Sequence, residues 1–192
     1  MRRLLLASSS RYRQELLSRL RLPFDTCAPE IDETPLPDES AEQLVRRLAE
    51  RKARALAERY PDHLIIGSDQ VAVRDGTILG KPHTLERAKQ QLLSASGGSV
   101  KFLTGLALLD SMNDRLQVDC VPFTVHFRTL DEARIERYLK AEQPYDCAGS
   151  FKAEGLGISL FRSTEGEDVT SLVGLPLIRL VDMLMIEGVE IP

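Results

Sequence analysis

The stretch His63-Leu-Ile-Ile-Gly-Ser-Asp69-Gln70-Val-Ala-Val73 decides the fold, because an apolar run ends there in a glycine, a hydroxyl and a carboxylate. The run from Leu64 to Ile66 is typical of a short strand that is covered on both faces. Gly67 lets the backbone turn or approach another segment closely. We therefore expect Asp69 just past the carboxyl end of an inner strand, where ligands bind in open α/β sheets. A solvated turn is the alternative, since aspartate is common after strands.

Composition limits the class of protein. A chain of 192 residues fits one domain with two lobes, which we expect to span residues 1–192. The net charge of -4 argues against a nucleic-acid partner but not against a nucleotide site. No apolar run approaches the roughly 18 residues of a membrane span, so we expect no membrane partner. The three cysteines show neither disulfide nor metal spacing, which indicates reduced thiols in a cytoplasmic protein.

The amino-terminal segment predicts an anion site. Leu4 to Leu6 reads as a buried strand, and Ser8 to Ser10 forms a hydroxyl-rich turn in which Ser10 can cap a helix. Arg13 shares the helix face of the leucines that follow it. A helix amino terminus presents free N–H groups and a favourable dipole to an anion. The alternative is an ordinary capped helix with a surface arginine.

An acidic loop and a long helix follow. The loop at residues 29–39 contains three prolines, so it is not helical, and Glu33 can supply an oxygen ligand to magnesium. A solvated acidic loop is the alternative. The capping box Ser40 to Gln43 starts a helix that we expect to end near Tyr60. Lys52 falls on its apolar stripe, where it either extends to solvent or reaches an anion in a cleft.

The second half of the chain continues as an α/β pattern. Asp75-Gly76 predicts a hairpin turn, after which Gly80-Lys81-Pro82 places a lysine in a tight loop. Two long strands are expected over residues 100–109 and 116–127. A glycine-spaced loop at residues 145–157 can bring backbone close to a flat ligand, and a strand is expected over residues 158–161.

The charged residues together indicate polyphosphate chemistry. Arg13, Lys52 and Lys81 offer cations for a triphosphate, whose transfer depends on positioning and charge stabilisation. Asp69 and Glu33 supply a metal site and a general base. The chain contains neither a Walker A sequence nor GxGxxG. The lack of a cysteine or histidine nucleophile pattern favours direct attack by water.

Several motifs in order resemble the Maf family of nucleoside triphosphate pyrophosphatases, over nearly the whole chain. They are Ala7-Ser-Ser-Ser-Arg-Tyr-Arg13, Glu33-Thr-Pro35, Gly67-Ser-Asp-Gln70, Gly80-Lys-Pro82, Thr104-Gly105 and Gly174-Leu-Pro176. Arg11 departs from the proline that is usual in the family. The resemblance implies a two-lobed mixed-sheet α/β fold with a deep central cleft, similar to inosine triphosphate pyrophosphatases, and a homodimer.

The resemblance also implies a set of site residues. Asp69 matches the catalytic acid of the family, as base for water or as metal ligand, and Glu33 matches a second metal carboxylate. The metal would be Mg²⁺ or Mn²⁺, and the reaction would be hydrolysis between the α- and β-phosphates. The matching phosphate-binding residues are Ser8, Ser10, Arg13, Lys52 and Lys81.

Within the family the chain is most similar to the 7-methyl-GTP pyrophosphatase subgroup, in which Tyr12, Gln70 and Glu154 match the specificity positions. A carboxylate can accept hydrogen bonds from both N1–H and N2–H₂ of guanine. An aromatic face such as Tyr12 gains roughly 0.5–2 kcal/mol on a cationic N7-methyl purine, although helix packing is the alternative role for Tyr12. Two other functions stay open: a dTTP/UTP pyrophosphatase, and a non-catalytic nucleotide-binding regulator of cell division.

Overall fold

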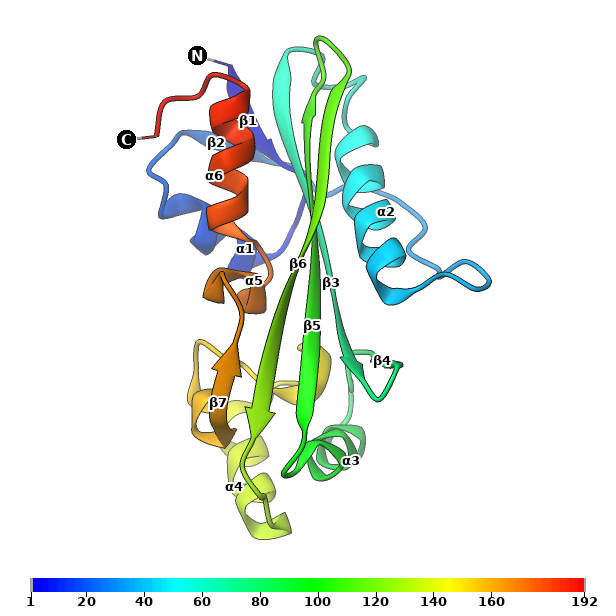
Figure 1. Ribbon diagram of the computed structural model, residues 1–192, viewed down its shortest axis with the longest axis vertical. Helices are drawn as coiled ribbons and strands as arrows, with labels where there is room; N and C mark the ends of the chain where they lie inside the picture. The colour runs from blue at the N-terminus through cyan, green and yellow to red at the C-terminus, as the bar shows by residue number, and fades with distance from the viewer. Residues whose placement is uncertain (1, 192) are drawn as a thin grey trace. The chain divides into compact units, whose positions relative to one another are not determined.

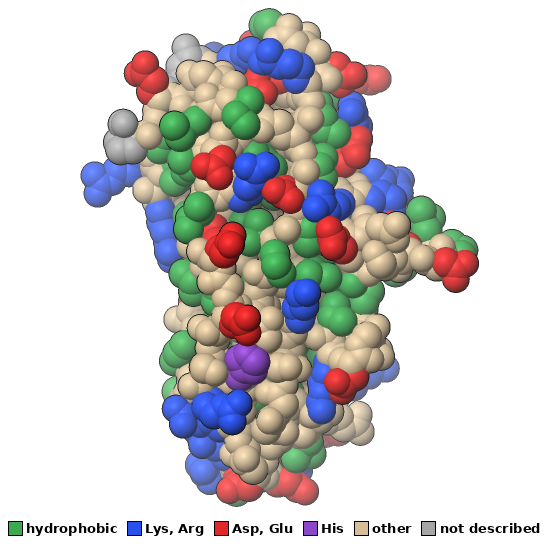
Figure 2. Space-filling view, viewed as in Figure 1, with side chains coloured by type: hydrophobic (Ala, Val, Ile, Leu, Met, Phe, Trp, Pro, Cys, Tyr) green, Lys and Arg blue, Asp and Glu red, His purple; other side chains and the backbone are tan. Residues whose placement is uncertain are grey.

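The computed structural model describes residues 2–191, and the chain divides into two compact units. Unit 1 comprises residues 1–70, 103–121 and 168–192, and unit 2 comprises residues 71–102 and 122–167. Acidic and basic side chains are interspersed over much of the face drawn in Figure 2.

The strands form one seven-stranded sheet in the order β2-β1-β3-β5-β6-β7, with β4 paired to β3 (Figure 1). Their bounds are β1 Arg3–Leu6, β2 Phe24–Thr26, β3 His63–Arg74, β4 Thr77–Leu79, β5 Ser99–Asp110, β6 Arg115–Phe127 and β7 Phe161–Glu165. β1 pairs in parallel with β2 and β3, whereas β4 and β7 pair antiparallel with β3 and β6. The sheet is therefore mixed, and the expected α/β fold class is confirmed.

The helices divide between the two units. Unit 1 contains α1 Arg11–Ser18, α2 Ala41–Arg54, α5 Val169–Val173 and α6 Leu177–Ile186. Unit 2 contains α3 Leu85–Ala95, α4 Glu132–Glu142 and the short 3₁₀ helices η1 Ala148–Ser150 and η2 Leu156–Leu160. No helix over residues 2–191 is long and apolar enough to cross a membrane.

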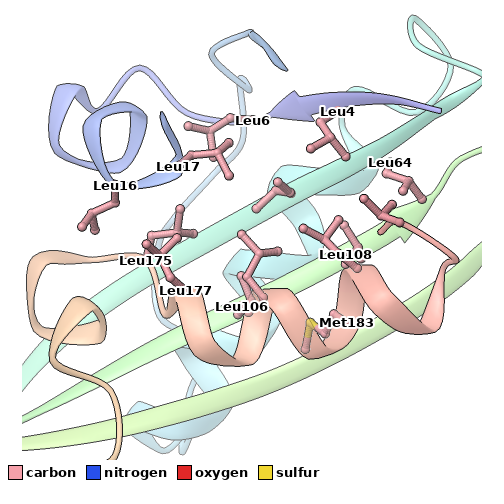
Figure 3. Packing of buried hydrophobic residues seen from close by; sticks show 14 residues of the cluster. Leu4, Leu6, Leu16, Leu17, Leu64, Leu106, Leu108, Leu175, Leu177 and Met183 are labelled. Atoms are coloured by element: carbon pink, nitrogen blue, oxygen red, sulfur yellow. The ribbon is translucent and has the colours of Figure 1, made fainter. Parts of the chain in front are cut away.

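Unit 1 is a three-layer sandwich, because its strands are apolar on both faces. Leu4 and Leu6 of β1 pack with α1 and α6, and Figure 3 shows this core from close by. Leu5 of β1 points to the other face, where it packs with residues of α2. Side chains alternate between faces along a strand, so a continuous apolar run is what two covered faces require.

A turn, one of the two roles expected for Gly67, is absent, because β3 runs through this residue without a break. The structure shows the second expected role, the close approach of another segment to the glycine backbone. A Cβ atom at this position would lie 2.0 Å from the carbonyl oxygen of Ala49, so α2 approaches the strand more closely than any side chain permits. Asp69 consequently lies inside β3 and not past its end.

Other expectations are confirmed or corrected locally. Ser10 caps α1, and the β3–β4 hairpin turns at Asp75 and Gly76, both with positive φ. Helix α2 ends at Arg54, before the expected Tyr60, and continues only as turns. The expected strand over residues 158–161 is wrong for most of its length, because η2 extends to Leu160 and β7 begins only at Phe161. A Cβ atom at Gly157 would lie 2.3 Å from the carbonyl oxygen of Lys152, so the chain packs closely on itself here.

Unit 2 is held together by aromatic packing. Phe151 contacts Phe102, Phe127 and Phe161 edge to face, with ring centroids 5.3, 5.5 and 4.9 Å away. These geometries are the ones that aromatic rings prefer. The cluster therefore joins the loop around η1 to β5, β6 and β7 within this unit.

Candidate active site

Two carboxylates meet one lysine in the interior of unit 1. Nζ of Lys52 on α2 lies 2.6 Å from Oδ1 of Asp69 on β3 and 2.8 Å from Oε1 of Glu33. Lys52 and Asp69 are only 7% and 8% exposed, whereas the Glu33 side chain is 56% exposed. Of the two alternatives for Lys52, extension to solvent is therefore wrong, and its part in binding phosphate stays a prediction.

Two glycines explain why a side chain from α2 reaches the strand. Gly67 on β3 and Gly105 on β5 both lie under the helix, where a Cβ atom would be 2.0 Å from Ala49 O and 2.1 Å from Val45 O, respectively. Backbone therefore packs against backbone along this face. The lysine that follows on α2 is then close enough to place its ammonium group beside Asp69.

Arg13 is held by the carbonyl oxygen of Gly174. Its Nε donates to that oxygen at 2.8 Å, and its Nη1 lies 3.5 Å from Oγ of Ser8. Burial lowers the pKa of the Arg13 guanidinium, and the negative charges of Asp69 and Glu33 oppose this shift. Arg13 therefore belongs to the same electrostatic neighbourhood as the two carboxylates.

The serine turn precedes α1 as expected. Ser10 accepts a hydrogen bond from the backbone N–H of Arg13, and Ser8 accepts one from the backbone N–H of Ser10. Ser8 is buried and Ser9 is exposed. The turn thus places Ser8, the capped amino terminus of α1 and Arg13 side by side, which is the arrangement that binds anions at helix termini.

Ser68 is a residue of the site that sequence reasoning missed. It is fully buried, and its Oγ lies 2.9 Å from the carbonyl of Gly105 and 3.0 Å from that of Gly174. The hydroxyl therefore joins β3 to β5 and to the carbonyl that holds Arg13. The motif gave a signal, since Ser68 stands beside Asp69 among apolar strand residues, where a hydroxyl needs a partner.

Gln70 is fixed through its amide nitrogen. Nε2 donates to the carbonyl of Ser171 at 2.7 Å and to Oγ1 of Thr104 at 3.0 Å. Thr104 itself donates to the carbonyl of Ser171 at 2.8 Å. The network anchors Gln70 to α5 and β5, and its predicted part in base specificity stays a prediction.

Three further predicted residues are Tyr12, Lys81 and Glu154. Tyr12 is half-buried in the first turn of α1 in unit 1. Lys81 and Glu154 are exposed residues of unit 2. Lys81 follows β4, and Glu154 lies between η1 and η2. Their roles on a substrate stay predictions.

The loop that carries Glu154 is tied to α4. The backbone N–H of Lys152 donates to the hydroxyl of Tyr138 at 3.1 Å, and the backbone N–H of Leu156 donates to Glu142 at 2.7 Å. Burial raises the pKa of the nearby Cys147 thiol to about 12, so this cysteine stays protonated at neutral pH. It therefore does not supply a thiolate nucleophile.

The donor set of unit 1 fits a magnesium-type cation. The Asp69 and Glu33 oxygens converge on one positively charged atom, and both are the hard ligands that Mg²⁺ takes in ones or twos beside water and phosphate. Within residues 2–191 no group of three or more His, Cys, Asp or Glu side chains could hold a metal. Asp69 and Glu33 are therefore residues that could contribute oxygen ligands to such a cation.

The chain is similar to known proteins over nearly its whole length. The family model described as Maf-like protein matches residues 3–186. The chain is 73% identical over 189 residues to the 7-methyl-GTP pyrophosphatase of Pseudomonas fluorescens strain Pf0-1, covering 98% of each chain. It is 75% identical to the 7-methyl-GTP pyrophosphatase of Pseudomonas aeruginosa strain PAO1, again covering 98% of each. The solved Ham1 protein of Staphylococcus aureus is 13% identical, with TM-score 0.46 over 65% of this chain and 71% of that one.

Proposed function

The chain belongs to the Maf-like protein family, and we propose that it hydrolyses 7-methyl-GTP to 7-methyl-GMP and diphosphate. It is then a hydrolase that acts on acid anhydrides and removes modified nucleotides. The observation that carries the proposal is the meeting of Asp69 and Glu33 at Lys52, beside Arg13 and the amino terminus of α1. The choice of base is supported by relatives of that name at more than 70% identity.

The residues of unit 1 divide the work between charge and proton transfer. Lys52, Arg13 and the Ser8–Ser10 turn bind the phosphate chain, because they present cations and N–H donors to its oxygens. Asp69 accepts the proton of the attacking water, since a carboxylate is an adequate base for a positioned water. Glu33 and Asp69 would hold a divalent cation, Mg²⁺ or Mn²⁺, which neutralises phosphate charge when bound.

The residues proposed for unit 2 rest on the sequence resemblance. Lys81 would contact phosphate, and Glu154 would accept hydrogen bonds from the guanine edge while offsetting the positive charge of the methylated base. Tyr12 and Gln70 of unit 1 complete the proposed specificity set. We also propose a cytoplasmic location, which the odd number of cysteines without disulfide spacing supports, and a homodimer.

Diphosphate release from equal concentrations of 7-methyl-GTP, GTP, dTTP and UTP tests the proposal, with Mg²⁺ or Mn²⁺ present. We expect 7-methyl-GTP to be preferred over GTP, and Glu154→Gln to reduce that preference with little change in stability, since Glu154 is exposed. A preference for dTTP or UTP would keep the catalytic residues and overturn the base assignment. Binding of all four without release would favour the regulator.

A further inference from the structure

The acidic loop, residues 29–39, carries Glu33 but has no strand or helix of its own. The Glu33 side chain is 56% exposed and meets Lys52 from the solvent side. An ion pair with one exposed partner holds a loop only weakly, because solvent screens the Glu33 carboxylate and its side chain loses entropy. Other contacts must therefore set the position of Glu33.

Arg47 on α2 supplies those contacts. Its Nε and Nη2 atoms lie 2.5 and 2.7 Å from the two carboxylate oxygens of Glu39, in a bidentate pair. Nη2 also donates to the carbonyl of Thr34 at 3.1 Å, directly after Glu33 in the chain. The Arg47 guanidinium group therefore binds the loop at two points: at Glu39, its last residue, and at Thr34, which follows Glu33.

The loop is shaped to meet this grip. The Glu39 side chain is only 7% exposed, and it also accepts the backbone N–H of Leu36 at 3.0 Å. Asp32 accepts a hydrogen bond from the backbone N–H of Thr34 at 2.9 Å, and this bond spans Glu33. The hydrogen bond from Arg47 lowers the pKa of Glu39 to about 2, so the pair stays charged at neutral pH.

We propose that Arg47 is a positioning residue, which fixes the acidic loop on α2 so that the Glu33 carboxylate lies beside Lys52 and Asp69. The inference rests on the proposed function, because it treats Glu33 as a ligand of the divalent cation. Only a planar fork with several donors can hold both oxygens of Glu39 and a carbonyl together, so lysine is not an equivalent residue.

Variants of Arg47 and its neighbour test this role. Arg47→Met removes the hydrogen bonds to Glu39 and Thr34, and Arg47→Lys keeps the positive charge without the bidentate guanidinium group. Arg46→Met is the matched control, because Arg46 lies next on the same helix but pairs with Glu42 and Asp119. Three quantities are measured: hydrogen exchange of the Thr34 and Leu36 amides, Mn²⁺ affinity of the nucleotide-free protein by electron paramagnetic resonance, and the Mg²⁺ concentration for half-maximal activity.

We expect Arg47→Met to speed exchange at both amides and to weaken Mn²⁺ binding by about 10- to 100-fold, as loss of an outer-shell partner does. The half-activating Mg²⁺ concentration should rise in step, while kcat at saturating Mg²⁺ changes less. Arg47→Lys should change amide exchange, Mn²⁺ affinity and the half-activating Mg²⁺ concentration less, in the same directions. Arg46→Met should change none of the three. If Arg47→Met fails to fold, Arg47→Lys and Glu39→Gln carry the test.

The outcomes separate this inference from the proposed function. Unchanged amide exchange in the Arg47 variants would show that Arg47 does not fix the acidic loop, and would overturn the inference. Faster exchange with unchanged Mn²⁺ affinity and Mg²⁺ dependence overturns the positioning role alone. A wild-type protein that releases no diphosphate from any nucleotide overturns the proposed function, whatever the exchange rates show.

Discussion

Nζ of Lys52 on α2 lies 2.6 Å from Oδ1 of Asp69 on β3, although the two residues are 17 positions apart in the sequence. Both side chains are nearly buried. A buried ion pair stabilises a fold only when each charge keeps its partner, because removing one leaves the other desolvated. The pair is therefore a site of chemistry and also a point on which unit 1 depends.

Replacing Asp69 tests the proposed base. Asp69→Asn keeps the shape and the hydrogen-bond acceptor beside Lys52 but removes the negative charge that accepts a proton. We expect a loss of at least about 10²-fold in kcat, the usual contribution of a positioned acid or base, with nucleotide binding retained. Diphosphate release and nucleotide titration measure the two effects. Asp75→Asn, in an exposed hairpin turn, is the control and should be active.

Replacing Lys52 tests the electrostatic balance. Lys52→Met should destabilise the protein by about 3–5 kcal/mol in urea unfolding, since Asp69 is left buried without its cation. The double variant Lys52→Met, Asp69→Asn should regain part of that loss. Arg51→Met, which changes an exposed neighbour, should have little effect. Equal stability of the single and double variants would contradict the coupling.

The packing of α2 can be tested at Gly67. A methyl group there meets the Ala49 carbonyl 2.0 Å away, so Gly67→Ala must push the helix from β3. We expect a loss of about 1–3 kcal/mol in unfolding free energy, together with lower activity as Lys52 moves away from Asp69. Gly98→Ala is the comparison, because its added Cβ would make an ordinary 3.5 Å contact. Equal melting temperatures for the two variants would refute the close approach.

The Arg47–Glu39 pair predicts a pH dependence. The hydrogen bond from Arg47 lowers the pKa of Glu39 in the folded protein from 4.5 to about 2. A depressed folded pKa gives stability that is complete above pH 4.5 and is lost as the pH falls toward 2. Unfolding of Glu39→Gln, measured over that range, should show a smaller decline than the wild type. Parallel curves for the two proteins would contradict this role of the pair.

Much of the local structure could be predicted because it is encoded in neighbouring residues. Ser10 caps α1 and Ser40 caps α2, as expected for serines that directly precede an amphipathic helical pattern. The hairpin at Asp75-Gly76 follows from two residues that tolerate positive φ. Lys52 could be placed on the apolar face of its helix from spacing alone.

Other features could not be predicted because they depend on partners distant in the chain. Which of the two expected roles Gly67 has could not be told from the sequence, because its close approach depends on Ala49 of α2. Leu130, just before the Asp131 cap of α4, is buried and its backbone N–H bonds to the hydroxyl of the distant Ser96. The shared carbonyl of Gly174, which holds both Arg13 and Ser68, involves residues from opposite ends of the sequence.

The sequence by itself determined which residues could do the chemistry: the apolar strands, the serine turn, and the cations and carboxylates of a polyphosphate site. Those properties belong to side-chain type and to spacing within one element. Only the tertiary structure decided that Asp69 and Glu33 share one ammonium group, that Gly174 holds Arg13, and that Arg47 grips the acidic loop. The Lys52–Asp69 contact arises because the backbone of α2 can approach the sheet closely at Gly67 and Gly105, which no local pattern specifies.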